Sequence, residues 1–275
     1  MTEDPEARVA ELFDAVADTY DAVGVDFFEP IAAGLVAELA PQPGERALDV
    51  GCGRGAVLLR LADAIGPTGH VTGIDAARRM VELTRADVVA AGVGSFVDVA
   101  VGDANAPDAP GAMFDLVASS LVLFFLSDPL AALRAWREVL HDGGRLGVTT
   151  FGPLNDEWNA VEQLLRSYLP PEQLDPRSNT GGPFSSDAAM AQLVQDAGFV
   201  EVRTASTTIE VRFEDPDAWY RWSMSHGQRQ FWESIPAEDV DGVRAAAAEA
   251  MRGAVRPDGR LGFDQVVRYT LARKS

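Results

Sequence analysis

The chain contains little cysteine and few basic residues relative to its acidic ones. Its 275 residues include one cysteine, which excludes both an internal disulfide and a cysteine-ligated metal cluster. Acidic residues number 42 against 23 basic ones, giving a formal net charge of −19. A polyanion would be repelled over most of such a surface, and no basic run interleaved with aromatic residues offsets this. The sequence therefore argues against DNA or RNA as a partner.

Long hydrophobic runs are also missing. The longest conspicuous uncharged stretch, residues 116–127, lies between Asp115 and Asp128 and is too short to span a bilayer. The acidic N-terminal segment lacks the apolar core of a signal peptide. We therefore expect a soluble, cytoplasmic enzyme with one large α/β domain and additions to it, and no membrane span. The oligomeric state is left open.

The most informative segment is residues 48–56, which read LDVGCGRGA. The apolar residues 46–50 predict a buried strand, and residues 56–65 predict a helix whose first N–H groups favour an anionic ligand. Between them, Gly51, Gly53 and Gly55 allow positive φ angles and a close approach of backbone to ligand. The segment predicts a nucleotide site built from a strand, a glycine loop and a helix.

The glycines alone leave two cofactor classes open, since Gly51, Gly53 and Ala56 also satisfy the dinucleotide fingerprint. Asp49 would repel a pyrophosphate and suits a ligand with an ammonium or sulfonium charge instead. The segment resembles the first motif of class I S-adenosylmethionine-dependent methyltransferases. In that family the glycine loop cradles the methionine part of the cofactor.

Further strands follow at the spacing that such a fold needs. Residues 70–75 predict a second strand, and Asp75 comes about 20 residues after the glycine loop, where an acid accepts hydrogen bonds from ribose hydroxyls. The same residue is compatible with a role as N-cap of a helix over residues 76–91. Three more strands are expected at residues 96–101, 114–119 and 145–151, with a helix at 129–140 and a turn at 142–144.

The order of these motifs resembles the methyltransferase type 11 branch, which includes ubiquinone, menaquinone and natural-product methyltransferases. The resemblance is strongest over residues 46–152. It implies that S-adenosyl-L-methionine is the cofactor, that S-adenosyl-L-homocysteine is the product and that no metal is needed. It also implies that Asp103 meets the exocyclic amine of adenine, and that Tyr20, in a segment similar to the N-terminal cap of that branch, closes over the cofactor. The cofactor-binding residues expected are Tyr20, Asp49, Gly51, Cys52, Gly53, Gly55, Asp75, Ala76, Met80, Asp103, Ala104 and Ser119.

Some of these residues also fit plainer roles. Met80 has the helical spacing of a core residue. Cys52 also fits the role of a small loop residue, and Asp103 that of an acid in a solvated loop. Tyr20 suits a structural role as well as a cofactor contact. These alternatives stay open at the level of the sequence.

The predicted fold is α/β: a Rossmann-like, seven-stranded, mostly parallel sheet with helices on both faces, an N-terminal helical cap and a C-terminal helical lid insertion. Residues 185–197 predict a helix, 200–213 a long sixth strand and 266–272 the seventh, and two helices are expected in the lid, the second at about 237–253. The expected division is a cap at 1–45, the cofactor-binding core at 46–152, substrate-side helices and the sixth strand at 153–213, the lid at 214–263 and the last strand at 264–275.

The lid is rich in aromatic residues. Trp219, Trp222 and His226 stand at positions i, i+3 and i+7, which predicts one helical face. Such residues either pin a lid to the sheet or line an apolar pocket above the sulfonium. Phe124, at a place where relatives often carry histidine, and Trp158, on a helix expected at 155–168, favour the pocket. The residues predicted to contact the substrate are Phe124, Trp158, Trp219 and Trp222.

The function that follows is S-adenosylmethionine-dependent methyl transfer to a small, largely apolar or aromatic metabolite. In-line displacement requires the protein to align the nucleophile with the methyl group and to exclude water. A general base is needed only where a proton must leave early, and His226 is the candidate for it. One alternative is a methyltransferase fold with other chemistry, such as a cyclase, a decarboxylase or a binding module. Another, an NAD-dependent oxidoreductase, is disfavoured by Asp49 and Asp103.

Overall fold

The computed structural model describes residues 5–107, 114–169 and 182–275. Seven strands form one sheet in the order β3-β2-β1-β4-β5-β7-β6. The strands are β1 (Arg46–Val50), β2 (His70–Asp75), β3 (Val97–Val101), β4 (Phe114–Ser120), β5 (Leu140–Phe151), β6 (Val200–Phe213) and β7 (Leu261–Arg273). The first five pair in parallel, while β7 runs antiparallel between β5 and β6. The predicted Rossmann-like, mostly parallel sheet is confirmed.

Helices cover both faces of this sheet, and the described α-helices are α1 (Pro5–Val16), α2 (Phe28–Leu39), α3 (Ala56–Ile65), α4 (Arg78–Ala90), α5 (Pro129–Val139), α6 (Asp156–Arg166), α7 (Asp187–Asp196), α8 (Pro216–Ser223), α9 (Arg229–Glu233) and α10 (Val240–Ala250). Of these, α3, α5, α6, α7 and α10 lie near the predicted positions. Short polar side chains explain several starts: Asp128, Asn155, Ser186 and Asp215 accept the N–H three residues on and so cap α5, α6, α7 and α8.

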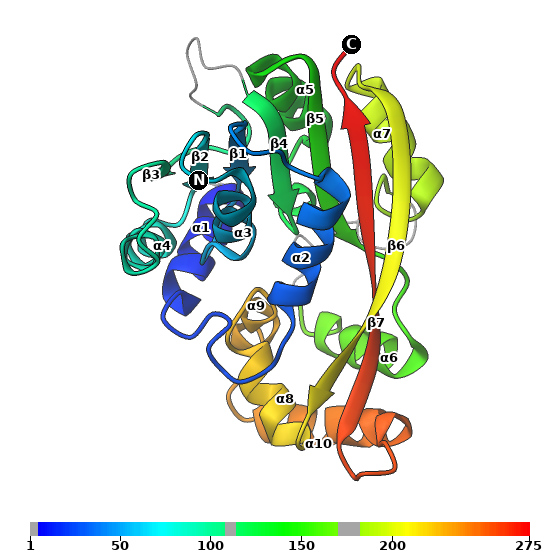
Figure 1. Ribbon diagram of the computed structural model, residues 1–275. Helices are drawn as coiled ribbons and strands as arrows, with labels where there is room; N and C mark the ends of the chain where they lie inside the picture. Colours follow the sequence, from blue (N-terminus) through cyan, green and yellow to red (C-terminus); the bar gives the residue numbers. More distant parts are fainter. Residues whose placement is uncertain (1–4, 108–113, 170–181) are drawn as a thin grey trace.

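The sheet lies between two apolar layers because successive strand residues point to opposite faces. Ala47 packs with the layer that holds α2, α3 and α4, whereas Leu48 packs with the layer of α5 and α7. In Figure 1, α2 and α3 lie in front of the sheet and α5 and α7 behind it. Burial on both faces accounts for the nearly continuous apolar sequence of β1.

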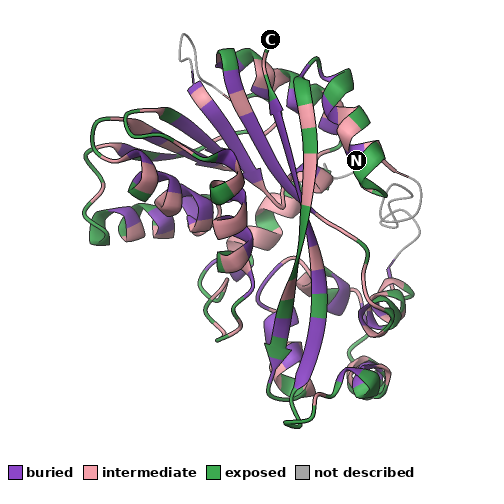
Figure 2. Cartoon of the chain, turned by 45° about the vertical axis from the view of Figure 1, so that its right-hand side comes forward, coloured by how far each residue is buried: buried purple, intermediate pink, exposed green. Residues whose placement is uncertain are grey.

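The β6–β7 hairpin continues well past the parallel strands. Residues 209–213 of β6 pair with residues 261–265 of β7, and α6, α8 and α10 pack around this lower part (Figures 1 and 2). The predicted start of the last strand at Val266 is therefore wrong. Leu261, Phe263 and Gln265 are buried, and pairing of residues 261–265 with β6 extends the strand toward its N-terminal end.

Two other predicted bounds differ from the structure. The lid insertion holds three α-helices rather than two, because α8 ends at Ser223. There the Ser223 hydroxyl donates to the Tyr220 carbonyl and the Ser225 hydroxyl to the Trp222 carbonyl. His226 thus lies beyond α8 and does not share its face with the tryptophans. Strand β5 begins at Leu140, and its pairing with β4 is irregular across the predicted 142–144 turn. The division of the chain into five parts stays a prediction.

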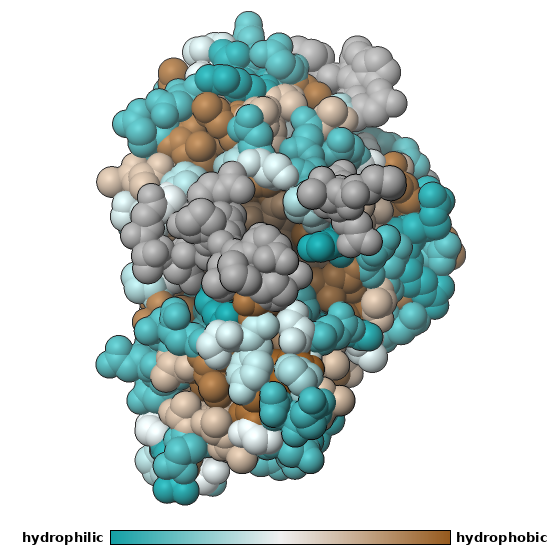
Figure 3. All heavy atoms as spheres, turned by 180° about the vertical axis from the view of Figure 1, so that it is seen from behind, coloured by the Kyte–Doolittle hydropathy of each residue, from teal (hydrophilic) through white to brown (hydrophobic). Residues whose placement is uncertain are grey.

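On the face of the molecule in Figure 3, hydrophilic residues predominate and apolar ones form separated patches. No helix within the described ranges combines the length and the apolarity needed to cross a membrane.

Candidate functional site

The glycine loop leaves β1 and enters α3 with positive φ angles at each glycine: 71° at Gly51, 49° at Gly53 and 83° at Gly55. A Cβ atom on Gly51 would overlap the Val122 side chain, which follows β4. On Gly53 it would meet no protein atom within 4 Å. Gly51 is therefore required by close packing, while Gly53 leaves the loop backbone open to the cavity described below.

Asp75, at the end of β2, binds the loop directly. Its Oδ2 accepts the Gly53 N–H at 2.8 Å, and its Oδ1 accepts the Ala77 N–H at 2.9 Å. Burial raises the pKa of Asp75, and these two N–H groups oppose the rise. A carboxylate oxygen can accept more than one hydrogen bond, so Asp75 retains capacity for ligand hydroxyls. The N-cap of α4 is Ala77, so the suggested capping role for Asp75 is wrong.

Asp49 lies beneath the loop, in register with Gly73 of β2 and Ala118 of β4. It is 1% exposed, and neither carboxylate oxygen has a hydrogen-bond partner in the described structure. Burial, and then the charge of Asp75, raise the pKa of Asp49 to about 8; the backbone N–H of Leu58 opposes the rise, although it does not reach hydrogen-bonding geometry. A buried, unpaired carboxylate is costly unless a proton or a nearby cation compensates it. The site therefore favours a ligand with positive charge near the loop.

A cavity opens at the carboxyl ends of β1, β2, β3 and β4, with about 790 Å³ of empty space including its mouth. This size suits a nucleoside cofactor. Of the predicted cofactor residues, those on its wall are Tyr20, Gly51, Gly53, Asp75, Ala76, Met80, Asp103 and Ala104. The others, Asp49, Cys52, Gly55 and Ser119, are not on its wall. Ser119, for example, is buried and donates to the Val50 carbonyl at 2.9 Å.

The far end of the cavity is closed by contacts that the sequence analysis did not find. Asp103 Oδ1 accepts the Asn105 N–H at 2.8 Å, and the Asn105 amide donates to Glu6 Oε2 at 2.6 Å. The other Glu6 oxygen accepts the Ser127 N–H at 2.8 Å. These bonds hold the start of α1 over the Asp103 end. The Asp-x-Asn spacing at 103–105 is a local signal for such a turn, whereas nothing local points to Glu6.

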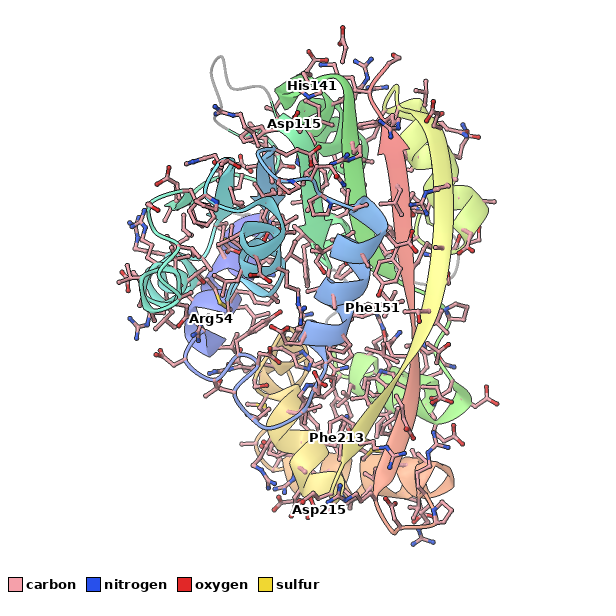
Figure 4. All side chains as sticks on the ribbon, viewed as in Figure 1. Arg54, Asp115, His141, Phe151, Phe213 and Asp215 are labelled. Carbon is pink, nitrogen blue, oxygen red and sulfur yellow. The ribbon has the colours of Figure 1, made fainter. Side chains whose placement is uncertain are left out.

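The rest of α1 and the segment after it form an aromatic wall. Phe13, Tyr20 and Phe125 line the cavity. Tyr20 stacks on Phe28 with ring centroids 4.5 Å apart, and burial raises the pKa of its phenol. Arg54 of the glycine loop donates to the Ala17 carbonyl at 3.1 Å and to Asp87 at 2.8 Å, so it joins the cap to the loop and to α4 (Figure 4).

The segment after β4 completes the wall in a strained conformation. Leu121 has φ = 60°, a value that a leucine rarely adopts, and its N–H donates to the Thr149 carbonyl and hydroxyl at 3.2 and 3.1 Å. This places Val122 against Gly51. The sequence offers no signal for Leu121, because leucine does not mark such a position.

The residues predicted to contact the substrate do not line the cavity. Trp158, Trp219 and Trp222 are 7%, 2% and 2% exposed, and they pack in the aromatic core below the sheet. Figure 4 labels Phe213 within this lower part of the molecule and Phe151 above it. Phe124 stacks on Phe151 at 5.7 Å, and only its neighbour Phe125 reaches the cavity wall. A role for these residues in acceptor binding stays a prediction.

His226 is also buried and lies outside the cavity wall. Its ring packs on Trp222 at 4.2 Å and on Phe28 at 6.1 Å, and burial lowers the pKa of the imidazole to about 3. Figure 4 places His141 with Asp115 at the opposite end of the sheet, where Nε2 of the ring lies 2.6 Å from the carboxylate. Because burial lowers the pKa of its imidazole, His226 is neutral near neutral pH.

The comparisons with known proteins show the family of the chain. Residues 48–148 match the family described as methyltransferase domain. The chain is 37% identical over 255 residues to nocamycin O-methyltransferase of Saccharothrix syringae, covering 88% of this chain and 89% of that protein. It is 35% identical over 212 residues to aklanonic acid methyltransferase DauC of Streptomyces sp. (strain C5), covering 73% and 95%. Among solved structures, the cyclase SpnF gives a TM-score of 0.54 at 21% identity over 90% of this chain and 81% of that one.

The likeness to SpnF is one of fold alone. The two relatives, by contrast, share more than a third of their aligned residues with this chain over most of their length, and both are named methyltransferases. Neither oxidoreductase activity nor other chemistry on the same fold is favoured. The chain therefore belongs to the family of S-adenosylmethionine-dependent methyltransferases, as the resemblance in its glycine loop implied.

Proposed function

We propose that the cavity binds S-adenosylmethionine with its methionine part at the glycine loop, its ribose at Asp75 and its adenine toward Asp103. The observation that carries this proposal is that Gly53, Asp75 and Asp103 share one cavity wall. The unpaired Asp49 carboxylate beneath the loop suits the positive charges of the cofactor. When bound, this cofactor supplies a methyl group already activated on a sulfonium.

The chain's own residues then have a simple task. The loop and Asp75 orient the cofactor, and Phe13, Tyr20 and Phe125 exclude water from one side of the cavity. We propose that no metal takes part. A cytoplasmic location stays a prediction.

Calorimetric titration tests the cofactor assignment. We expect S-adenosylhomocysteine to bind and NADH not to bind. Asp75→Ala should weaken S-adenosylhomocysteine binding by about 1–3 kcal/mol, the range for hydrogen bonds to a charged group. Asp98→Ala, which removes a 77% exposed carboxylate at the start of β3, is the control. Equal affinities for the wild type and Asp75→Ala would remove Asp75 from the site.

We further propose that the acceptor is a small, largely apolar or aromatic molecule methylated on oxygen. Two observations support this. The cavity wall near the glycine loop is aromatic, and the relatives are named for nocamycin and aklanonic acid, the former as an O-methyltransferase. A panel of hydroxylated or carboxylated aromatic compounds, with arylamines for comparison, tests the proposal. Methyl transfer to oxygen acceptors supports it, and transfer confined to the amines contradicts it.

A further inference from the structure

Two polar atoms in the turn between α8 and α9 are buried without a partner. They are Nε2 of His226 and Oε1 of Gln228, and neither makes a hydrogen bond within the described structure. The whole His226 residue is only 8% exposed. Buried polar atoms in proteins are nearly always paired with protein, ordered water or a ligand, so these two atoms in one turn mark a place where a polar partner can bind.

This turn lies directly behind the aromatic wall of the cavity. A Cβ atom on Gly227, between the two polar residues, would stand 3.6 Å from the rings of both Phe13 and Phe125. On its other side, the His226 ring contacts Phe28, which in turn stacks on Tyr20. Phe13, Phe125 and Tyr20 all line the cavity. A molecule that extends beyond the cofactor and displaces Phe28 would meet the turn.

The hydrogen bonding of the ring identifies its protonation. Nδ1 of His226 accepts the backbone N–H of Gln228 at 3.3 Å. A neutral imidazole has one accepting and one donating nitrogen, so an accepting Nδ1 leaves the proton on Nε2. Burial among Trp222 and Phe28 keeps the ring neutral, with its pKa lowered to about 3. The unpaired Nε2 is thus a donor, and the neighbouring Gln228 Oε1 is an acceptor.

We propose that His226 binds the methyl acceptor by donating Nε2–H to a carbonyl or anionic oxygen, with Gln228 Oε1 accepting from a hydroxyl of the same molecule. This inference rests on the proposed function and deepens it, because it assigns the acceptor molecule an oxygen that accepts from His226 and a hydroxyl that donates to Gln228. It also gives His226 a role different from that of a general base. Nε2 of the neutral ring already carries a hydrogen, and the buried imidazole is only weakly basic. His226 therefore cannot remove a proton from the acceptor.

Nitrogen NMR of protein labelled with ¹⁵N-histidine tests the tautomer directly and does not depend on the cofactor. Spectra of His226→Phe assign the His226 signals. We expect the Nε2–H form of a neutral ring from pH 5 to pH 9. A proton on Nδ1, or titration of His226 within that range, would overturn the proposal. Failure of the proposed function would show separately, as a wild-type protein that does not bind S-adenosylhomocysteine.

The ligand contact is tested with 2′-hydroxyacetophenone, which carries a carbonyl beside a phenol that stays protonated near neutral pH, added to the S-adenosylhomocysteine complex. We expect the probe to shift the His226 Nε2–H signal without protonating the ring. His226→Gln keeps a distal N–H and should hold the probe within about threefold of the wild type, whereas His226→Phe should weaken it about tenfold. S-adenosylhomocysteine affinity should be unchanged in both, and in the control His70→Gln at the other end of β2. Absence of probe binding, or equal binding by all variants, contradicts the proposal.

Discussion

At the scale of single residues, Gly51 and Gly53 have similar backbone angles but different surroundings. A side chain at Gly51 is both strained and in collision with Val122, so we expect Gly51→Ala to lower the free energy of unfolding by about 2–4 kcal/mol. Gly53→Ala meets no protein atom and should cost about 1 kcal/mol, but its methyl group enters the cavity and should weaken cofactor binding at least tenfold. Urea unfolding and calorimetry separate the two effects, and the same stability loss in both variants would contradict this assignment.

Asp49 should make the cofactor-free protein less stable as the pH rises. Its pKa is about 8 in the folded chain, above the ordinary value of 3.8 that applies after unfolding. Because the folded chain holds this proton more tightly than the unfolded chain, the contribution of Asp49 to the free energy of unfolding is fully present below about pH 4. It is lost progressively as the pH rises to about 8. We therefore expect Asp49→Asn to gain stability relative to the wild type over this interval, on the order of several kcal/mol by pH 8.

Urea unfolding at pH 5 and pH 8 checks this, with Asp63→Asn, an exposed carboxylate on α3, as control. A constant difference between the Asp49→Asn variant and the wild type at the two pH values would show that Asp49 is ionised at both.

Residues of the candidate site could be predicted from the sequence where their role depends on residues next to them in the chain. The loop glycines, Asp75 and Asp103 follow strands whose apolar runs are plain in the sequence. Glu6 and Leu121 were not predictable. Glu6 acts across a long sequence separation on Asn105 and Ser127, and Leu121 adopts its conformation only because Thr149 binds its N–H.

At the scale of elements, α1 and the residue after it are joined to the cavity wall by polar bonds from other elements. Arg54 joins the glycine loop to the Ala17 carbonyl and to Asp87. We expect Arg54→Met to release bound cofactor about tenfold faster, equivalent to about 1.4 kcal/mol, a modest value because the side chain is partly exposed. Stopped-flow dissociation of S-adenosylhomocysteine measures this rate.

Arg60→Met is the matched control, because Arg60 pairs with Glu29 on the surface of α3 away from the cavity wall. Wild-type dissociation rates for both variants would contradict a role for Arg54 in holding the cap over the cavity, and would leave that task to the Glu6 bonds and the apolar contacts.

The lid helices depend on buried aromatic residues. Trp222 of α8 contacts Phe27, Trp158 and Phe213 at centroid distances of 5.1, 5.6 and 5.2 Å. We expect Trp222→Ala to lower the free energy of unfolding by about 3–5 kcal/mol and to impair acceptor use more than cofactor affinity. Trp222→Phe should recover most of the stability. If Trp222→Ala weakens both ligands equally, the residue is structural only.

Element ends were predictable where a strand or helix stops at a strong local signal. The bounds of β2 and α3 match because glycine or aspartate ends each apolar run. The start of β7 was missed because Gly262 and Asp264 interrupt the apolar pattern, and only pairing with β6 shows that the strand continues. The break after α8 depends on serine hydroxyls that bond back to the helix, a weak signal in sequence.

At the scale of the whole molecule, the parallel half of the sheet and the antiparallel hairpin have separate tasks. The loops after β1, β2, β3 and β4 meet at one edge and form the cavity, as ligand sites of open α/β sheets do. The extended hairpin carries α8, α9 and α10, and the turn with His226 and Gln228 reaches back to the cavity's aromatic wall. We therefore expect the cofactor to bind at the parallel half of the sheet, and we propose that the part carried by the hairpin selects the acceptor.

The central claim is that this cavity delivers a methyl group from S-adenosylmethionine to an oxygen of an aromatic acceptor. The most direct measurement is transfer of an isotopically labelled methyl group to the acceptor panel by wild-type and Asp75→Ala proteins. We expect labelled O-methyl product in a one-to-one ratio with S-adenosylhomocysteine, formed at least tenfold more slowly by Asp75→Ala below cofactor saturation. Tight binding of S-adenosylhomocysteine without labelled product from any acceptor would contradict the claim.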